Sequence, residues 1–144
     1  MVVAPELFNE DHATECLQLM NKVLLGPLGM RTLDPADKRY RPYYRNNEDS
    51  EDFDTAKGRN YHQGPEWVWP TGYYLRAAYK FKTLTPPEIA RITRAHRDHI
   101  STDIWAGLPE LTNKDGETCW DSCFTQAWSA SGLLDLMFDM QQQQ

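Results

Sequence analysis

One segment of ten residues, 61–70, places polar side chains that can hydrogen-bond beside aromatic rings. It contains a histidine, a glutamine and a glutamate next to two tryptophans. Sugars present hydroxyl groups along their edges and apolar C–H groups on their faces, so carbohydrate sites combine polar side chains with aromatic platforms. The segment fits such a site. It also fits a second interpretation, in which both tryptophans are core residues and His62 is a satisfied side chain at the start of a helix.

A second candidate is Glu110, a single carboxylate that follows a proline in segment 105–113, among apolar residues and a tryptophan. A partly desolvated carboxylate is a better base near neutral pH, so Glu110 can act as a general base. The alternative is a helix-capping or solvated loop glutamate. A third segment, 125–130, carries Gln126 and Trp128, which can line a cleft, although the pattern by itself favours packing of Trp128 in the core.

Other clusters of reactive side chains are weak. Cys119 and Cys123 are four residues apart and His96 and His99 are three apart, and neither pair has a metal-site spacing with the rest of the chain. No phosphate-binding glycine loop or nucleophile elbow is present. The sequence therefore predicts no metal ion and no cofactor.

The composition limits the class of protein. The chain has 144 residues, which fits one domain, and a formal net charge of −6, which argues against nucleic acid as a partner. No apolar run approaches the ~20 residues of a membrane span, and the N-terminus does not resemble a secretion signal. Three cysteines are too few for a disulfide scaffold. These features predict a soluble cytoplasmic protein whose 12% aromatic content serves a core or a ligand.

The elements that position these residues are predicted to be helices, because apolar residues recur at three- and four-residue steps and little alternates with period two. Asn9 and the Thr85–Glu88 capping box mark two helix starts. The fold class is therefore all-α, with long irregular stretches at 26–63 and 103–122 and a polar tail at 141–144. The predicted helices cover residues 10–25, 65 or 66 to 82, 86 to about 102, and 124–140.

The apolar residues also predict which helix faces are buried. The third helix is expected to bury Ile89, Ile92 and Ile100 and to expose a stripe of arginines. The last helix is expected to turn five side chains inward: Ala127, Trp128, Leu134, Met137 and Phe138.

Four stretches together resemble the glycogen debranching enzyme family, in the C-terminal part of its amylo-α-1,6-glucosidase domain. They are residues 25–35, 61–70, 107–113 and 125–129, and all four occur in this order over most of the chain. The resemblance implies that residues 1–144 are a C-terminal segment of an (α/α)6 toroid of six helical hairpins. About four helices are too few for the whole toroid, so the chain is expected to be a fragment that is inactive when isolated and exposes apolar faces to solvent.

The resemblance also implies an activity, the inverting hydrolysis of α-1,6-linked glucose at glycogen branch points. Glu110 would be the general base that deprotonates the attacking water, and the general acid would lie upstream of Met1. The implied partners are glycogen or a branched limit dextrin and the remainder of the barrel. The residues implied to bind the terminal glucose are His62, Gln63, Glu66, Trp67, Trp69, Gln126 and Trp128.

Two alternatives remain open at this point. The chain can belong to another inverting enzyme of the same fold, such as a glucoamylase-like α-glucosidase, although segment 61–70 favours the debranching enzyme family. It can also be a non-catalytic glucan-binding or interaction module that kept the wall of the cleft and lost the acid.

Overall fold

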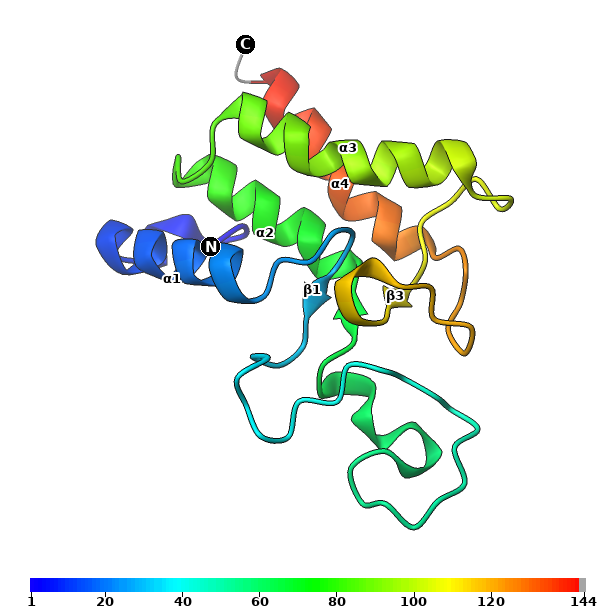
Figure 1. Cartoon of the computed structure of the whole chain (residues 1–144). Coiled ribbons are helices and arrows are strands. Elements are labelled where there is room, and N and C mark those ends of the chain that lie inside the picture. Colours follow the sequence, from blue (N-terminus) through cyan, green and yellow to red (C-terminus); the bar gives the residue numbers. More distant parts are fainter. Residues whose placement is uncertain (143–144) are drawn as a thin grey trace.

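The computed structural model describes residues 1–142, which are mostly helical (Figure 1). The α-helices are α1 (Glu10–Val23), α2 (Trp69–Lys80), α3 (Pro86–Thr102) and α4 (Ala127–Gln142). Short 3₁₀-helices are η1 (Pro5–Leu7), η2 (Ala56–His62) and η3 (Lys114–Gly116). A small antiparallel sheet has the order β1-β2-β3, with strands β1 (Met30–Arg31), β2 (Glu66–Trp67) and β3 (Leu111–Thr112).

Two helices begin where their capping residues predict. The Asn9 side chain accepts a hydrogen bond from the backbone N–H of His12 at 3.1 Å and caps α1. At the start of α3, the Glu88 carboxylate accepts a hydrogen bond from the backbone N–H of Thr85 at 2.7 Å and completes the capping box. Such caps satisfy N–H groups that have no partner within the helix, so local sequence is sufficient to place both starts.

The all-α prediction needs one correction, at residues 66–67. The sequence predicts that a helix begins at residue 65 or 66, but these two residues form β2, and α2 begins only at Trp69, with Pro70 in its first turn. Strand β2 is the middle strand of the sheet and pairs with β1 on one side and β3 on the other. These pairings join segments that are distant in sequence, so a local pattern of apolar residues does not reveal them.

The main hydrophobic core lies among the four α-helices. One fully buried residue from each helix illustrates it: Leu17, Leu75, Ile89 and Leu136 are all at most 2% exposed. Helices α2 and α4 approach most closely where Gly72 and Gly132 face each other. A Cβ atom on Gly72 would lie 2.4 Å from the backbone carbon of Gly132, so the crossing leaves no space for a side chain.

Helix α4 presents to the core the opposite face from the predicted one. Its buried residues are Ser129, Gly132, Leu133 and Leu136. The small residues of that face permit the close crossing with α2, and hydropathy alone cannot identify this face because both sides of the helix are apolar. The side chains predicted to face inward are instead exposed: Ala127, Trp128, Leu134, Met137 and Phe138.

Helix α3 follows its prediction over its first turns only. Ile89 is buried, Ile92 is half-buried and the arginine stripe is exposed, as predicted. Ile100 is 37% exposed and does not join the core. The reason is that the core contacts α3 only as far as Ala95, and the last turns continue beyond it.

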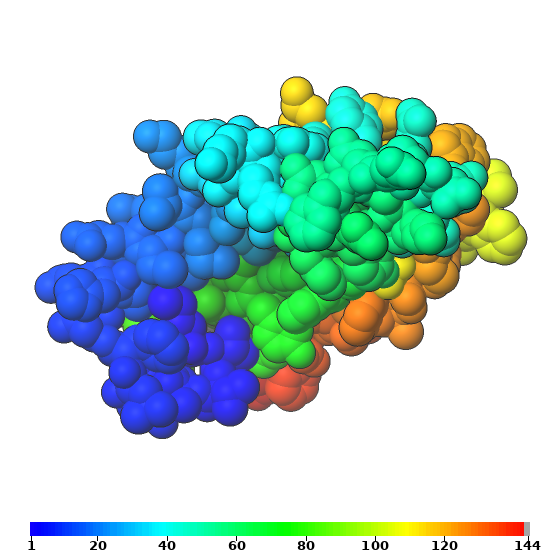
Figure 2. Space-filling view, turned by 90° about the horizontal axis from the view of Figure 1, so that it is seen from below, coloured from blue at the N-terminus to red at the C-terminus, as the bar shows by residue number. Residues whose placement is uncertain are grey.

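The irregular stretch predicted at 26–63 contains only β1 and η2 as regular structure, and much of it spreads over one face of the molecule (cyan to green in Figure 2). Two kinds of contact hold it. The Asp54 carboxylate binds the guanidinium groups of Arg39 and Arg41 at 2.6 and 3.0 Å. The Asn60 amide donates hydrogen bonds to two carbonyl groups of the stretch at 2.9 and 2.8 Å. A long loop is thereby fixed beside the sheet.

The C-terminal part of the chain differs from the predicted tail. Helix α4 continues through Gln141 and Gln142, and the rest of the predicted tail, residues 143–144, lies outside the described residues. Within residues 1–142, no helix is both long enough and apolar enough to cross a membrane.

His96 links α3 to the segment before β1 and gives stability a pH dependence. Its ring is 2% exposed, and Nε2 donates a hydrogen bond to the Leu28 carbonyl at 2.7 Å. Burial lowers the pKa of His96 below its ordinary value. As pH falls below about 6.5, histidine in the unfolded chain gains a proton that the buried ring does not accept, so stability falls.

We expect wild type to lose up to about 1.4 kcal/mol more than a His96→Gln variant between pH 7.5 and pH 5.5. Denaturant unfolding at both pH values measures this difference. Equal losses in the two proteins would contradict the assignment, because the other histidines titrate in both.

Candidate functional site

The sheet brings three of the four sequence segments into contact. Strand β1 belongs to residues 25–35, β2 to 61–70 and β3 to 107–113. Arg31 pairs with Glu66, which in turn pairs with Thr112. Segments that are separated by more than 30 residues in the chain are therefore adjacent in the fold.

The fourth segment joins the others through hydrogen bonds to residues 107–110. The backbone N–H of Gln126 donates to the Leu108 carbonyl at 2.8 Å. The buried Ser129 hydroxyl donates to the Pro109 carbonyl, also at 2.8 Å. Because Ser129 lies in the first turn of α4, this helix is fixed directly against the loop that carries Glu110.

Glu110 is held by its backbone on both sides and is half-buried. Its carbonyl accepts a hydrogen bond from the N–H of Val68 at 3.1 Å, and its own N–H donates to the Cys123 carbonyl at 2.9 Å. The first bond continues the ladder between β2 and β3 by one residue. The position of the Glu110 backbone therefore depends on the register of these two strands.

Aromatic rings form a continuous cluster beside this loop. The His62 ring stacks on the Trp67 ring with centroids 4.9 Å apart, and Tyr61 meets Trp67 edge-on at 4.6 Å. Trp128 lies 6.0 Å from both Trp67 and Trp69. Trp67 is only 6% exposed, whereas Trp128 is 46% exposed. The cluster therefore has a buried base and an open side.

Tyr61 connects the aromatic cluster to the Glu110 carboxylate. Burial, followed by interaction with Glu110, raises the pKa of Tyr61 above its ordinary value. Tyr44 stacks on Tyr61 with centroids 4.7 Å apart, and burial raises the pKa of Tyr44 as well. Both phenols therefore remain neutral near Glu110. Sequence reasoning gave no role to Tyr44, and only the aromatic content of the chain hinted at it.

Glu66 lies away from the open side of the cluster. Its side chain is fully buried, and its oxygens contact Arg31 Nε at 3.3 Å and the Thr112 hydroxyl at 3.2 Å. The backbone N–H groups of Asp115 and Gly116 donate to it at 3.1 and 3.0 Å. Burial raises the pKa of Glu66, while Arg31 and these donors act in the opposite direction. All of its partners are internal, so we do not carry Glu66 into the glucose site proposed below.

Comparison with known proteins places this arrangement in a family. The profile of the amylo-alpha-1,6-glucosidase family matches residues 1–135. The chain belongs to this family. The glycogen debranching enzyme of Saccharomyces cerevisiae (strain ATCC 204508 / S288c) is 53% identical over 156 aligned positions, which cover 97% of this chain and 10% of that relative. The chain therefore spans about a tenth of the length of this relative.

The part that matches the amylo-alpha-1,6-glucosidase family contains every residue predicted to act at the site. Beyond the cluster and Glu66, two amides remain to be placed. Gln63 follows η2 and is half-buried, and its Oε1 atom is buried without a hydrogen-bond partner among the described residues. Gln126 is half-buried directly before α4. The structure thus gathers His62, both predicted tryptophans of segment 61–70 and Trp128, with the amides on adjoining loops.

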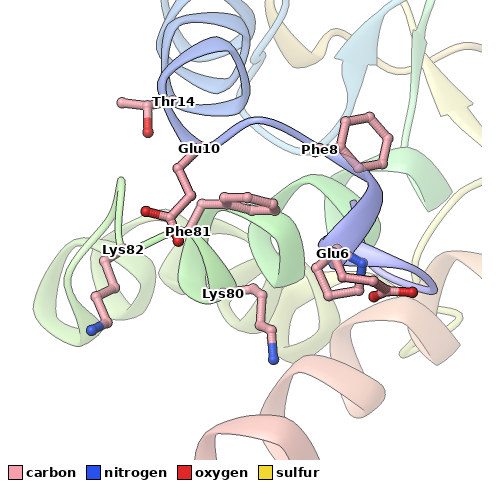
Figure 3. Close-up of a pocket in the computed structure, with 8 residues that line it drawn as sticks. Glu6, Phe8, Glu10, Thr14, Lys80, Phe81 and Lys82 are labelled. Carbon is pink, nitrogen blue, oxygen red and sulfur yellow. The ribbon is translucent and has the colours of Figure 1, made fainter.

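Hollows and metal-ligand clusters add nothing to the site in this glucosidase-family chain. Within residues 1–142, no group of three His, Cys, Asp or Glu side chains could hold a metal ion. A hollow of about 480 Å³ is lined by charged and apolar side chains near the N-terminus (Figure 3). Lys80, Phe81 and Lys82 line it at the far end of α2, roughly 16 Å from Trp69 at 1.5 Å per helical residue. None of the predicted site residues lines it.

Proposed function

We propose that this chain is part of an inverting glycoside hydrolase that removes α-1,6-linked glucose at glycogen branch points, with Glu110 as the general base. The observation that carries the proposal is the placement of Glu110: a half-buried carboxylate, fixed through its backbone and next to an aromatic cluster with an open side. Membership in the amylo-alpha-1,6-glucosidase family supports the same reaction.

In this mechanism the Glu110 carboxylate accepts a proton from a water molecule that attacks the anomeric carbon on the face opposite the leaving sugar. The neighbouring phenols of Tyr61 and Tyr44 stay protonated, so they can donate hydrogen bonds without adding negative charge. A carboxylate between apolar rings and one open side is partly desolvated, which favours proton abstraction.

The terminal glucose is proposed to bind on the open side of the aromatic cluster. The rings of Trp67, Trp69 and Trp128 would pack on its C–H faces. His62 is exposed and stacks on Trp67, so its ring nitrogens can reach sugar hydroxyls. The amides of Gln63 and Gln126 are proposed to complete the set of hydrogen-bonding groups. The substrate would be glycogen or a branched limit dextrin.

The general acid and the remaining cleft wall would come from other parts of a longer polypeptide, folded as an (α/α)6 toroid. The outer face of α4 supports this proposal. Four large apolar side chains of that face, Trp128, Leu134, Met137 and Phe138, are 43–64% exposed. An exposed apolar stripe of this kind is typical of a surface that packs against a partner. We propose that other helices of the barrel cover it.

The configuration of the released sugar tests the proposed reaction. A polypeptide that carries this chain together with the rest of the barrel should release β-glucose first from a branched limit dextrin, because attack by water inverts the α-linkage. Proton NMR during the first minutes measures the anomer before mutarotation. Initial release of α-glucose would contradict an inverting mechanism, and the absence of release would favour a glucan-binding module.

A further inference from the structure

Glu66 is the fully buried carboxylate that the proposed mechanism does not use. It binds a charged group, a hydroxyl and two backbone N–H groups, and these come from three separate elements: Arg31 from β1, Thr112 from β3, and Asp115 and Gly116 from η3. A carboxylate with this many donors is held in one position, because each lost bond would leave a buried polar group unpaired.

The space around Glu66 is filled on the remaining side. A Cβ atom added to Gly26 would lie 2.6 Å from the Glu66 carboxylate, and one added to Gly29 would lie 2.6 Å from the Glu66 backbone carbonyl. Arg31 extends the network, because its guanidinium also donates to the carbonyls of Val23 and Leu25, at the end of α1 and just beyond it. Glu66 therefore joins α1, all three strands and η3 into one rigid unit.

The strands connect this unit to Glu110. Glu66 pairs with Thr112, Trp67 pairs with Leu111, and the N–H of Val68 donates to the Glu110 carbonyl. Thr112 is bound to Glu66 at one end of this short ladder, and Glu110 lies at the other end, two residues away. A shift of β3 along β2 would move the Glu110 backbone by the same step.

We infer that Glu66 is a positioning residue that fixes the register of β3 against β2 and so holds Glu110 in place for reaction. This inference rests on the proposed function, and it replaces the expectation that Glu66 binds the sugar directly. Misplacement of a catalytic group by about 1 Å can lower the rate by ~10²-fold without contact to the substrate.

The test compares three variants in the complete polypeptide, at a temperature where circular dichroism shows each to be folded. Glu66→Gln keeps the shape but turns an NH2 group toward donors. Thr112→Val removes one hydroxyl and keeps the volume. Thr93→Val is the matched control, because Thr93 is also a buried threonine whose hydroxyl binds a carbonyl within α3, away from the ladder.

We expect Glu66→Gln to lower kcat for glucose release from limit dextrin by about 10²-fold and to change KM by less than twofold. Thr112→Val should lower kcat several-fold, and Thr93→Val should leave it unchanged. The acid limb of the kcat–pH profile should also move in the first two variants, because the surroundings of Glu110 change. Loss of stability alone would not produce that movement.

Other outcomes would overturn the inference. A large rise in KM with unchanged kcat would make Glu66 a sugar ligand, and unchanged kcat and KM would remove any positioning role. If Glu66→Gln does not fold, Thr112→Val decides, and unchanged kinetics in that variant overturn the inference. Glu110→Gln serves as the reference: if it remains active, the proposed function itself fails, whereas an inactive Glu110→Gln with normal Glu66 and Thr112 variants refutes only the role of Glu66.

Discussion

Replacement of Glu110 by glutamine in the complete polypeptide is expected to abolish release of glucose from a branched limit dextrin. Glutamine has the same shape and keeps both backbone hydrogen bonds, to Val68 and to Cys123, but its amide cannot accept the proton of the attacking water. General base catalysis contributes about 10²–10⁴-fold to a rate, so we expect a loss in this range, or ~3–5 kcal/mol in activation free energy. A coupled glucose assay measures the remaining activity.

Substrate binding and a matched variant separate this loss from misfolding. Binding of limit dextrin should persist in Glu110→Gln, because the aromatic cluster is untouched. Glu117→Gln makes the same chemical change at an exposed position seven residues later and should retain full activity. If Glu110→Gln retains activity close to wild type, Glu110 is not the base, and the proposed reaction loses its central residue.

The largest effect on stability is expected from Gly72→Ala, at the crossing of α2 and α4. The added Cβ would lie 2.4 Å from the carbonyl carbon of Gly132 and 2.6 Å from its Cα. Backbone atoms cannot rotate away as a side chain can, so α4 must move from α2. Overpacking of this kind costs about 1–3 kcal/mol, and we expect a value near the upper end. Thermal unfolding with and without the substitution measures it.

Gly132→Ala is the matched control at the same crossing. Its Cβ would lie 3.2 Å from the Gly72 Cα, a tight contact that a shift of a few tenths of an ångström relieves. Alanine also favours a helix over glycine by about 1 kcal/mol, which offsets part of the cost. Gly132→Ala should therefore destabilise the protein clearly less than Gly72→Ala. Equal effects would mean that helix propensity, rather than the close approach, controls stability at this crossing.

The two glycines also connect stability to the site. Helix α4 carries Trp128 on its outer side and binds the Glu110 loop through the Ser129 hydroxyl. A shift of α4 at Gly132 would therefore move both the exposed ring of the aromatic cluster and the loop that holds the proposed base. The close crossing thus serves the site as well as the core.

Some of this fold follows from the sequence alone, because the forces involved are local. Asn9 and the Thr85–Glu88 pair predict helix starts that the structure confirms, since a cap contacts a backbone N–H only a few residues away. The irregular character of the stretch before residue 63 also follows from its prolines and glycines. The order of the four segments was sufficient to indicate the family, and the profile match confirms it.

Only the tertiary structure decided which face of each element is buried and which residues meet. Residues 66–67 read locally as the start of a helix, yet Glu66 is bound to Thr112 and Asp115, 46 and 49 residues away, and these contacts make them a strand. Helix α4 is apolar on both sides, and its buried face was selected by the fit of Gly132 against Gly72. Local periodicity carries no information about partners so distant in the chain. For that reason the sequence could indicate Glu110 as a base, while the buried position of Glu66 emerged only when the strands were paired.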